Sequence, residues 1–246
     1  ATVRLSGSKT GVQYELWNGS SIIESKAGTG SAIAFLPTTI TCAYTVLAKN
    51  TTSGCSATMT GSPMVTMNSL PTAHDVTVAN GGAYCSGGLG VNVGLSYSDA
   101  GINYQLYRGT TPVGGLYTGS SSAIDFGVFT ATGTYTVRAT NATTGCADNM
   151  NGSAVVKMNA SPVAYNISGG GSYCAGSVVG VPVGLINSTV GVDYQLFNGT
   201  STGPIVSGTG GAISFGNQIA TGNHTIVGTD AVSGCTTTMT GSKVIS

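Results

Sequence analysis

The residues of this chain best suited to covalent chemistry are its cysteines, because four of the six recur at one spacing. Cys85 and Cys146 lie 61 residues apart (146 − 85), and Cys174 and Cys235 are separated by the same interval (235 − 174). Paired spacing without a Cys-x-x-Cys motif favours disulfides over zinc ligation or buried free thiols. A short strand at Cys85 beside the last strand of its domain would bring it next to Cys146. We expect one bridge within each pair, worth on the order of 4 kcal/mol in the chain-entropy model, and an oxidising compartment.

The other two cysteines do not fit this pattern. Cys55 occupies the place of Cys146 and Cys235, but its partner would lie just upstream of Ala1. Cys42 and Cys55 are expected at opposite ends of one strand, farther apart than the Cα separation of about 7 Å that a disulfide can span. We therefore expect two bridges in this chain, with Cys42 and Cys55 unpaired.

The remaining chemistry-bearing residues form no coherent site. His74 lies near a joint between repeats, and His224 takes the place of the core tyrosines Tyr44 and Tyr135. No base is positioned to activate the many serines and threonines, and the aspartates are scattered without the clustering typical of a calcium site. The Gly88-Leu-Gly90 segment precedes no helix and is therefore no phosphate loop. The sequence predicts no catalytic residue, no metal and no cofactor, and hence a protein that is not an enzyme.

The best candidates for a binding surface are three aromatic residues, one in each repeat at the same position: Trp17, Tyr107 and Phe197. They are predicted on the outward face of a strand or at its end, where a row of rings could stack on sugars. The simpler interpretation, which we favour, is that each ring packs on its own loop, for example on Val113. One ring per domain would make a thin platform for a glycan.

The elements that must position these residues are set by an internal repeat of 90 residues. The chain reads GVQYELWNG from Gly11, GINYQLYRG from Gly101 and GVDYQLFNG from Gly191, and each copy is followed by a phrase that begins Gly-Cys. Such a period is too long for a solenoid turn and suits one small β-sandwich. The sequence predicts tandem domains, with boundaries at 1–68, 69–159 and 160–246, which we name the first, second and third repeats.

Alternation of apolar and polar residues in the second repeat indicates strands with one buried face. About seven short strands between turns rich in Gly, Asn, Ser and Thr fit an immunoglobulin-like sandwich, and no segment has a helical period. Predicted strands are 74–79, 91–95, 102–107, 123–126, 134–140 and 154–158, with a short one at 84–85.

Composition excludes several partners. Charged residues make up only 7% of the chain, and eight basic residues balance eight acidic ones. A neutral chain lacks the field that steers proteins to nucleic acid or anionic membranes. No run of 18 apolar residues is present, so this segment is not expected to insert into a membrane. The 41% hydrophobic content argues for folded domains rather than disorder.

Joints and ends suggest a larger array. The joints 67–72 and 158–163 are short and carry proline, which favours sandwiches in line as a semi-stiff rod. Ala1 aligns with Val91 and Val181, so the first repeat lacks the stretch that matches residues 69–90. We expect either a piece of a longer array or a subunit completed by a neighbour's strand.

The repeat resembles a known type of module. The phrases Tyr84-Cys-Ser-Gly-Gly88, Gly101–Gly109 and Thr132–Cys146 are similar to the immunoglobulin-like repeats of giant Bacteroidota surface proteins, including adhesins of the gliding-motility type. The resemblance extends over all three repeats. It implies export by the type IX system, a place in a long surface filament and no catalytic residues.

Three functions follow as expectations. The leading one is the stalk of an extracellular, cell-surface adhesin that projects a binding tip, bears tension and contacts neighbouring repeats of the same long chain. The alternatives are a carbohydrate-binding module array, with surface glycans as partners, and a fibre subunit linked to identical chains by strand donation.

Overall fold

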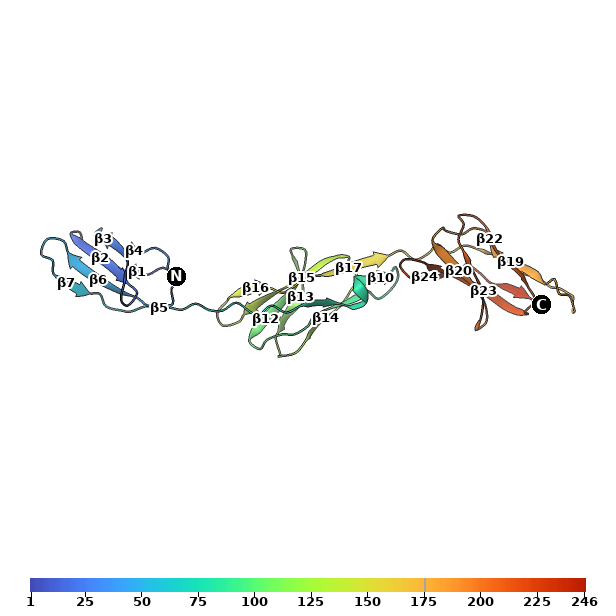
Figure 1. Ribbon diagram of the computed structural model, residues 1–246, viewed down its shortest axis with the longest axis horizontal. Coiled ribbons are helices and arrows are strands. Elements are labelled where there is room, and N and C mark those ends of the chain that lie inside the picture. Colours follow the sequence, from blue (N-terminus) through green and yellow to red (C-terminus); the bar gives the residue numbers. More distant parts are fainter. Residues whose placement is uncertain (175) are drawn as a thin grey trace. The chain divides into compact units, whose positions relative to one another are not determined.

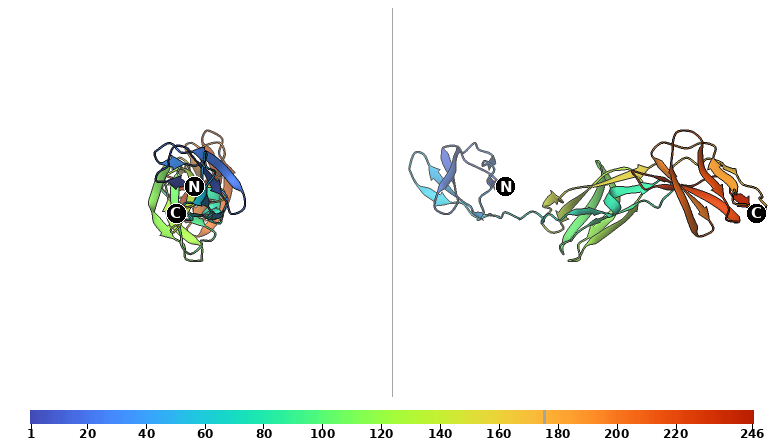
Figure 2. Two further views of the ribbon diagram at one scale, coloured as in Figure 1. Left: turned by 90° about the vertical axis from the view of Figure 1, so that its left-hand side faces the viewer. Right: turned by 45° about the vertical axis from the view of Figure 1, so that its right-hand side comes forward.

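The computed structural model describes residues 1–174 and 176–246, and the chain divides into two compact units, Ala1–Leu70 and Pro71–Ser246 (Figure 1). Apart from one 3₁₀ turn, η1 (Ala79–Gly82), the regular elements in these ranges are β-strands. They form β-sandwiches (Figure 2). The sandwiches enclose three hydrophobic cores, one in the first unit and two in the second. No helix within the described ranges is long and apolar enough to cross a membrane. The fold is all-β, built from tandem immunoglobulin-like sandwiches.

The second repeat has a large and a small sheet. Its strands are β9 (Val76–Val78), β10 (Ala83–Cys85), β11 (Val91–Leu95), β12 (Ile102–Arg108), β13 (Thr111–Thr118), β14 (Ile124–Phe129), β15 (Gly133–Asn141), β16 (Ala147–Asn149) and β17 (Ala154–Asn159). The large sheet has the order β10-β17-β15-β12-β13, with β16 also on β15, and the small sheet has the order β14-β11-β9. All pairs are antiparallel except β10 with β17, which is parallel.

The predicted alternation decides which side chains enter this core. In β15, Tyr135, Val137 and Ala139 are buried, while the residues that alternate with them, Thr134, Thr136, Arg138 and Thr140, lie on the outer face. Ile124 and Phe126 of β14 are also buried, as predicted. The strands β10 and β16 are short, and β13 lies at the edge of its sheet with mostly exposed residues. The sequence pattern therefore gave no signal for β13 or β16.

The third repeat repeats this plan. Its strands are β18 (Ile167–Gly169), β19 (Val181–Leu185), β20 (Val192–Asn198), β21 (Ser201–Ser207), β22 (Ile213–Gln218), β23 (Gly222–Asp230), β24 (Thr236–Thr238) and β25 (Lys243–Ile245). The larger sheet has the order β21-β20-β23-β24, with β25 also on β23, and the smaller one the order β18-β19-β22.

The first unit contains the same core strands in shorter form. Its strands are β1 (Arg4–Leu5), β2 (Val12–Trp17), β3 (Ile22–Ala27), β4 (Ile33–Ala34), β5 (Cys42–Ala43), β6 (Thr45–Asn50), β7 (Ser56–Thr58) and β8 (Met64–Val65). The orders are β3-β2-β6-β7, β1-β4 and β5-β8. β1 pairs only with β4, whereas its counterpart β11 pairs with both β14 and β9.

A buried tyrosine of the nine-residue motif ties each sandwich to the loop before it. The hydroxyl oxygens of Tyr14, Tyr104 and Tyr194 accept hydrogen bonds from the backbone N–H groups of Lys9, Asp99 and Thr189, at 3.0, 2.8 and 2.9 Å. Burial raises the pKa of the Tyr104 phenol above its ordinary value, although the hydrogen bond from the Asp99 N–H opposes this rise. This tyrosine is therefore a structural anchor in all three repeats.

Beside each anchor, a glycine lets the backbone pass the same loop. A Cβ atom on Gly28, Gly119 or Gly208 would lie 2.0, 2.0 or 1.9 Å from a carbonyl oxygen of that loop. No side chain fits at that separation. Glycine is thus required here by contact rather than by its backbone angles.

Candidate functional site

The structure joins two consecutive repeats by a disulfide. Cys85 of the second repeat bonds to Cys235 of the third, with a Cα–Cα distance of 5.6 Å and a sequence separation of 150 residues. The predicted pairings Cys85–Cys146 and Cys174–Cys235 are therefore wrong, because Cys85 and Cys235 bond to each other instead. Cys42, Cys55 and Cys174 form no disulfide within the described residues.

The error lies in where the last strand places Cys85. β10 does lie beside β17, as expected, and Cys85 is in register with Asn159. However, β17 pairs with the beginning of β15, whereas Cys146 precedes β16, which pairs with the end of β15. β15 has nine residues, so roughly 26 Å of strand separate the two cysteines. That distance far exceeds the separation that a disulfide can span.

Cys85 is held by a segment that we name the Tyr-Cys segment, residues 84–88. The hydroxyl of Tyr84 donates to the carbonyl oxygen of Thr130. The N–H of Gly88 donates to the Cys85 carbonyl at 2.9 Å, which closes a turn directly after the cysteine. The N–H of Ser86 donates to the Asn159 carbonyl at 2.8 Å, which fixes the segment to the strand that leads into the third repeat. The sulfur is thus presented at the end of the second repeat from which the chain leaves.

Cys235 is held by a turn that we name the Gly-Cys turn, residues 230–235. The Asp230 carboxylate accepts hydrogen bonds from the N–H groups of Val232 and Ser233, at 3.1 and 2.7 Å, and from the Ser233 hydroxyl at 2.8 Å. The Ser233 N–H is the main reason that the pKa of Asp230 lies below its ordinary value. Gly234, at φ 70°, allows the chain to reach the buried Cys235. The Cys235 carbonyl in turn accepts from the Asp230 N–H at 2.9 Å.

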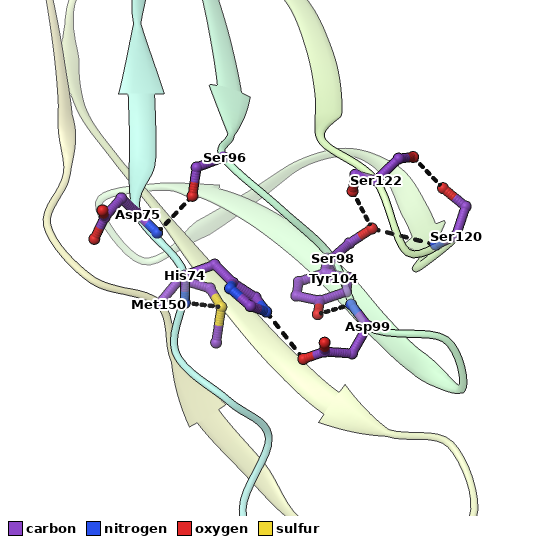
Figure 3. A network of polar contacts seen from close by, with 9 residues as sticks. All are labelled: His74, Asp75, Ser96, Ser98, Asp99, Tyr104, Ser120, Ser122 and Met150. Carbon is purple, nitrogen blue, oxygen red and sulfur yellow. Dashed lines mark hydrogen bonds and ion pairs between the residues drawn. The ribbon is translucent and has the colours of Figure 1, made fainter.

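Polar contacts also fix the residue with which the chain enters each of these two repeats, and Figure 3 shows those of the second repeat. The N–H of His74 points to the sulfur of Met150 at 3.4 Å, and its ring Nε2 lies 2.9 Å from Oδ2 of Asp99. Tyr165 makes the same contacts in the third repeat, with its N–H 3.3 Å from the sulfur of Met239 and its hydroxyl 3.0 Å from that of Thr189. The shared geometry gives His74 a structural role.

The serines near this histidine do not form a nucleophile–base pair with it. The Ser96 hydroxyl accepts from the Asp75 N–H at 3.0 Å, and the buried Ser98 hydroxyl donates to the Ser122 carbonyl at 2.6 Å (Figure 3). Catalysis by serine needs a hydroxyl bonded to the base. In the third repeat Ser188 donates to Gly211 in the same way, at 2.6 Å. The cluster shapes a loop.

The three aromatic candidates are all half-buried and occupy one register position. Trp17, Tyr107 and Phe197 are each flanked by a threonine of the next strand: Thr45, Thr136 and Thr225. The Trp17 indole Nε1 is buried and has no hydrogen-bond partner in the part of the chain that the structure describes. A hollow of about 200 Å³ lies beside it, lined by Gly19, Thr45, Leu47 and Thr58. This feature is the strongest small-molecule candidate among the three.

His224 lies in the core, as its place in the repeat predicts. It is 1% exposed, and its Nδ1 is 3.3 Å from the carbonyl oxygen of Gly222. Tyr44 and Tyr135 at this position donate their hydroxyl to the carbonyl four residues upstream, at 3.0 and 2.7 Å, which is the tyrosine corner typical of immunoglobulin-like domains. Within the described ranges, no three His, Cys, Asp or Glu side chains are grouped so that they could hold a metal.

No protein-family model matches the chain, and no curated protein sequence matches it. Solved structures of similar fold include the three-domain ectodomain of mouse nectin-like molecule 4, at 12% identity, covering 99% of this chain and 94% of that one, with a TM-score of 0.38. Three N-terminal domains of the bacteriophage RB49 outer capsid protein Hoc match at 12% identity, 96% and 88% coverage and a TM-score of 0.39. Fibronectin(III)-like modules of Clostridium thermocellum CbhA match at 14% identity, covering 70% of this chain and 93% of that one, with a TM-score of 0.37. At these values the likeness carries no argument about function.

Proposed function

We propose that the three repeats, 1–68, 69–159 and 160–246, are stalk modules of a secreted, cell-surface adhesin or extracellular filament. The observation that carries this proposal is the Cys85–Cys235 bond, which connects two consecutive repeats covalently. A bond inside one domain would stabilise that domain alone. A bond between domains resists their separation, which is a property useful to a spacer under tension.

Two further features support the proposal. Disulfides persist in oxidising surroundings outside the cytoplasm, which agrees with an extracellular location. The balanced charge and the small polar side chains give the repeats no strong field toward any one partner. The resemblance to repeats of giant Bacteroidota adhesins points in the same direction.

Replacement in the parent protein tests the stalk role. The segment 1–246 is exchanged, in the native gene, for the same number of unrelated immunoglobulin-like domains, and surface display and attachment of the cells are measured. A spacer tolerates this exchange, so attachment should persist, while simple deletion should reduce it. Loss of attachment with normal display after the exchange would contradict a spacer role. Antibody labelling of intact cells tests the location.

Trp17 supports glycan binding as a second candidate function. Its buried, unpartnered indole N–H and the adjoining hollow give the first repeat a donor and a ring beside one another. Binding of the chain to a glycan array should then fall on Trp17→Ala. Tyr107→Ala, at the equivalent place in the second repeat, is the matched control. An array without specific signals would leave the stalk role alone.

A further inference from the structure

We infer that Cys174 and Cys55 each form an inter-repeat disulfide of the same kind as Cys85–Cys235, with a cysteine of another repeat of this type. We call each of them an open half of such a bond. Cys174 corresponds to Cys85, and Cys55 corresponds to Cys235. When residues 1–246 are studied alone in solution, a second copy supplies such a repeat and is joined head to tail. The inference rests on the geometry of the Cys85–Cys235 bond and goes beyond the proposed stalk role.

Cys174 lies in a second copy of the Tyr-Cys segment. The hydroxyl of Tyr173 donates to the carbonyl oxygen of Ile219, which has the place of Thr130 in the second repeat. The Cys174 carbonyl accepts from the N–H of Ser177 at 2.9 Å, as the Cys85 carbonyl accepts from Gly88. The Tyr173 N–H bonds to the Ser246 carbonyl at 3.0 Å, so this segment also runs along the last strand of its repeat. The same scaffold that presents the bonded Cys85 presents an exposed, unbonded Cys174.

Cys55 lies in a copy of the Gly-Cys turn. The Asn50 Oδ1 accepts from the N–H groups of Thr52 and Ser53, both at 2.9 Å, in place of the Asp230 carboxylate. The Asn50 N–H donates to the Cys55 carbonyl at 2.9 Å, as in the third repeat. Gly54 has a φ of 72°, against 70° for Gly234. Cys55 is exposed and unbonded, whereas the cysteine in the equivalent turn of the third repeat is bonded and buried.

An unbonded cysteine alone would indicate nothing. The second observation here is the formed bond between the equivalent segments, which shows what a Tyr-Cys segment and a Gly-Cys turn do when they meet. The two halves differ in structure, so the contact is heterologous and propagates in one direction. In each copy of the chain, Cys174 is exposed in a Tyr-Cys segment and Cys55 is exposed in a Gly-Cys turn.

The bond requires an oxidant, and a low-molecular-weight disulfide such as oxidised glutathione supplies it. One cysteine thiolate attacks the small disulfide, which gives a mixed disulfide and releases one small thiolate. The second cysteine thiolate then attacks the protein sulfur of the mixed disulfide and releases the other small thiolate. The two small thiolates take up the protons that the two cysteines lost. Two cysteine sulfurs are oxidised, and the small disulfide is reduced to two thiols.

Two full-length variants test the proposal, each lacking one half, and both also carry Cys146→Ser because Cys146 lies in a further Gly-Cys turn. Cys55→Ser retains the open Cys174, and Cys174→Ser retains the open Cys55. In a buffer of reduced and oxidised glutathione, each variant alone should stay a monomer on a non-reducing gel, and only their mixture should shift to a dimer. The unaltered chain should form longer ladders, and Cys42→Ser should form them equally well. Reductant should remove every band above the monomer.

Mapping of the bonded peptides decides the outcome. A peptide with Cys174 joined to one with Cys55 is the expected product. Dimers of either variant alone, a bond from Cys174 to Cys174 or Cys42, or a Cys174 that stays a free thiol at high protein concentration would overturn the inference. None of these outcomes bears on the exchange experiment in cells, so failure of one proposal is distinguishable from failure of the other.

Discussion

The second and third repeats share the same central strands but differ in one buried corner. In the second repeat the ring of Tyr135 lies 5.0 Å from that of Phe129, and its hydroxyl closes the tyrosine corner. The third repeat has His224 in place of the tyrosine and Gln218 in place of the phenylalanine. A hollow of about 220 Å³ remains there, lined by both of these residues, Gly203 and Ala220.

This difference shows that the corner is a packing device that the fold can partly forgo. The third repeat keeps the pairing and register of β20, β23 and β25 although an imidazole replaces the phenol ring and an amide replaces the phenyl ring at this place. Gln218 donates to the Phe215 carbonyl at 2.8 Å, so its amide is at least partly satisfied. We expect the third repeat to be the less stable of the two when each is considered without the disulfide.

The largest effect on stability should come from removal of the Cys85–Cys235 disulfide, which couples the unfolding of the second and third repeats. Cys85→Ser removes it, and closing a loop of 150 residues is worth about 5 kcal/mol in the chain-entropy model. We expect thermal unfolding of the second and third repeats to move to lower temperature and to separate into two steps. Cys174→Ser, at the equivalent unbonded position, is the control and should leave the transition unchanged. A single unshifted transition for both variants would contradict the structural importance of the bond.

A smaller loss should follow when a shared contact is broken in one repeat only. Gly119→Ala places a Cβ about 2.0 Å from the Asp99 carbonyl oxygen, so the backbone must shift, at a cost of about 3 kcal/mol. Hydrogen exchange should show loss of protection confined to the second repeat. Gly115→Ala serves as the control, because nothing lies within 4 Å of a Cβ at that position. Equal effects of the two substitutions would rule out the contact as the cause.

Exchange of the corner residue should reduce the difference in stability between the second and third repeats. Tyr135→His gives the second repeat the histidine of the third and should cost about 2 kcal/mol through lost packing and a lost hydrogen bond. His224→Tyr partly fills the hollow and should stabilise the third repeat by about 1 kcal/mol. Urea unfolding followed by hydrogen exchange separates the two repeats. The expectation fails if His224→Tyr destabilises as much as Tyr135→His.

The smallest expected effect is the loss of stability of the Asp230 turn at low pH. Because hydrogen bonds lower the pKa of Asp230 in the folded protein, its contribution to stability is present above the unfolded pKa, near 3.8, and is lost as the pH falls through the lower folded value. Asp230→Asn reproduces the turn of the second repeat, where Asn141 accepts from Thr143 and Thr144 at 2.9 Å. Protection of the Ser233 amide should decline between about pH 5 and about pH 2 in the original chain and stay level in the variant. Parallel declines would assign the effect to other groups.

The sequence sufficed to predict the sandwich because its signals are local. The alternation in residues 134–140 and the period of 90 residues can both be read from the sequence without knowledge of the fold. The residues predicted to face the core are buried. The placement of His224 in the core followed from comparison of the copies. β13 was missed because an exposed edge strand has no apolar face to leave a pattern.

The disulfide could not be assigned from spacing alone. Because every repeat carries its cysteines at the same two places, a bond within one repeat and a bond between consecutive repeats both predict the same regular spacing. The interval of 61 residues therefore fits either connectivity. Only the pairing of β10 with the outgoing β17 shows that Cys85 lies at the far end of the domain from Cys146. The unmatched Cys55 was the one available signal for a bond between repeats.

The Cys85–Cys235 bond also determines how much length the chain can release when it is stretched. A force applied to the two ends passes from Cys85 directly to Cys235, so residues 86–234 lie outside the covalent path that carries it. At about 3.4 Å for each extended residue, roughly 500 Å of contour length is withheld, even if both sandwiches lose their structure. Reduction of this one bond would return that length to the chain. Two sulfur atoms thus convert a pair of extensible domains into a segment of nearly constant reach.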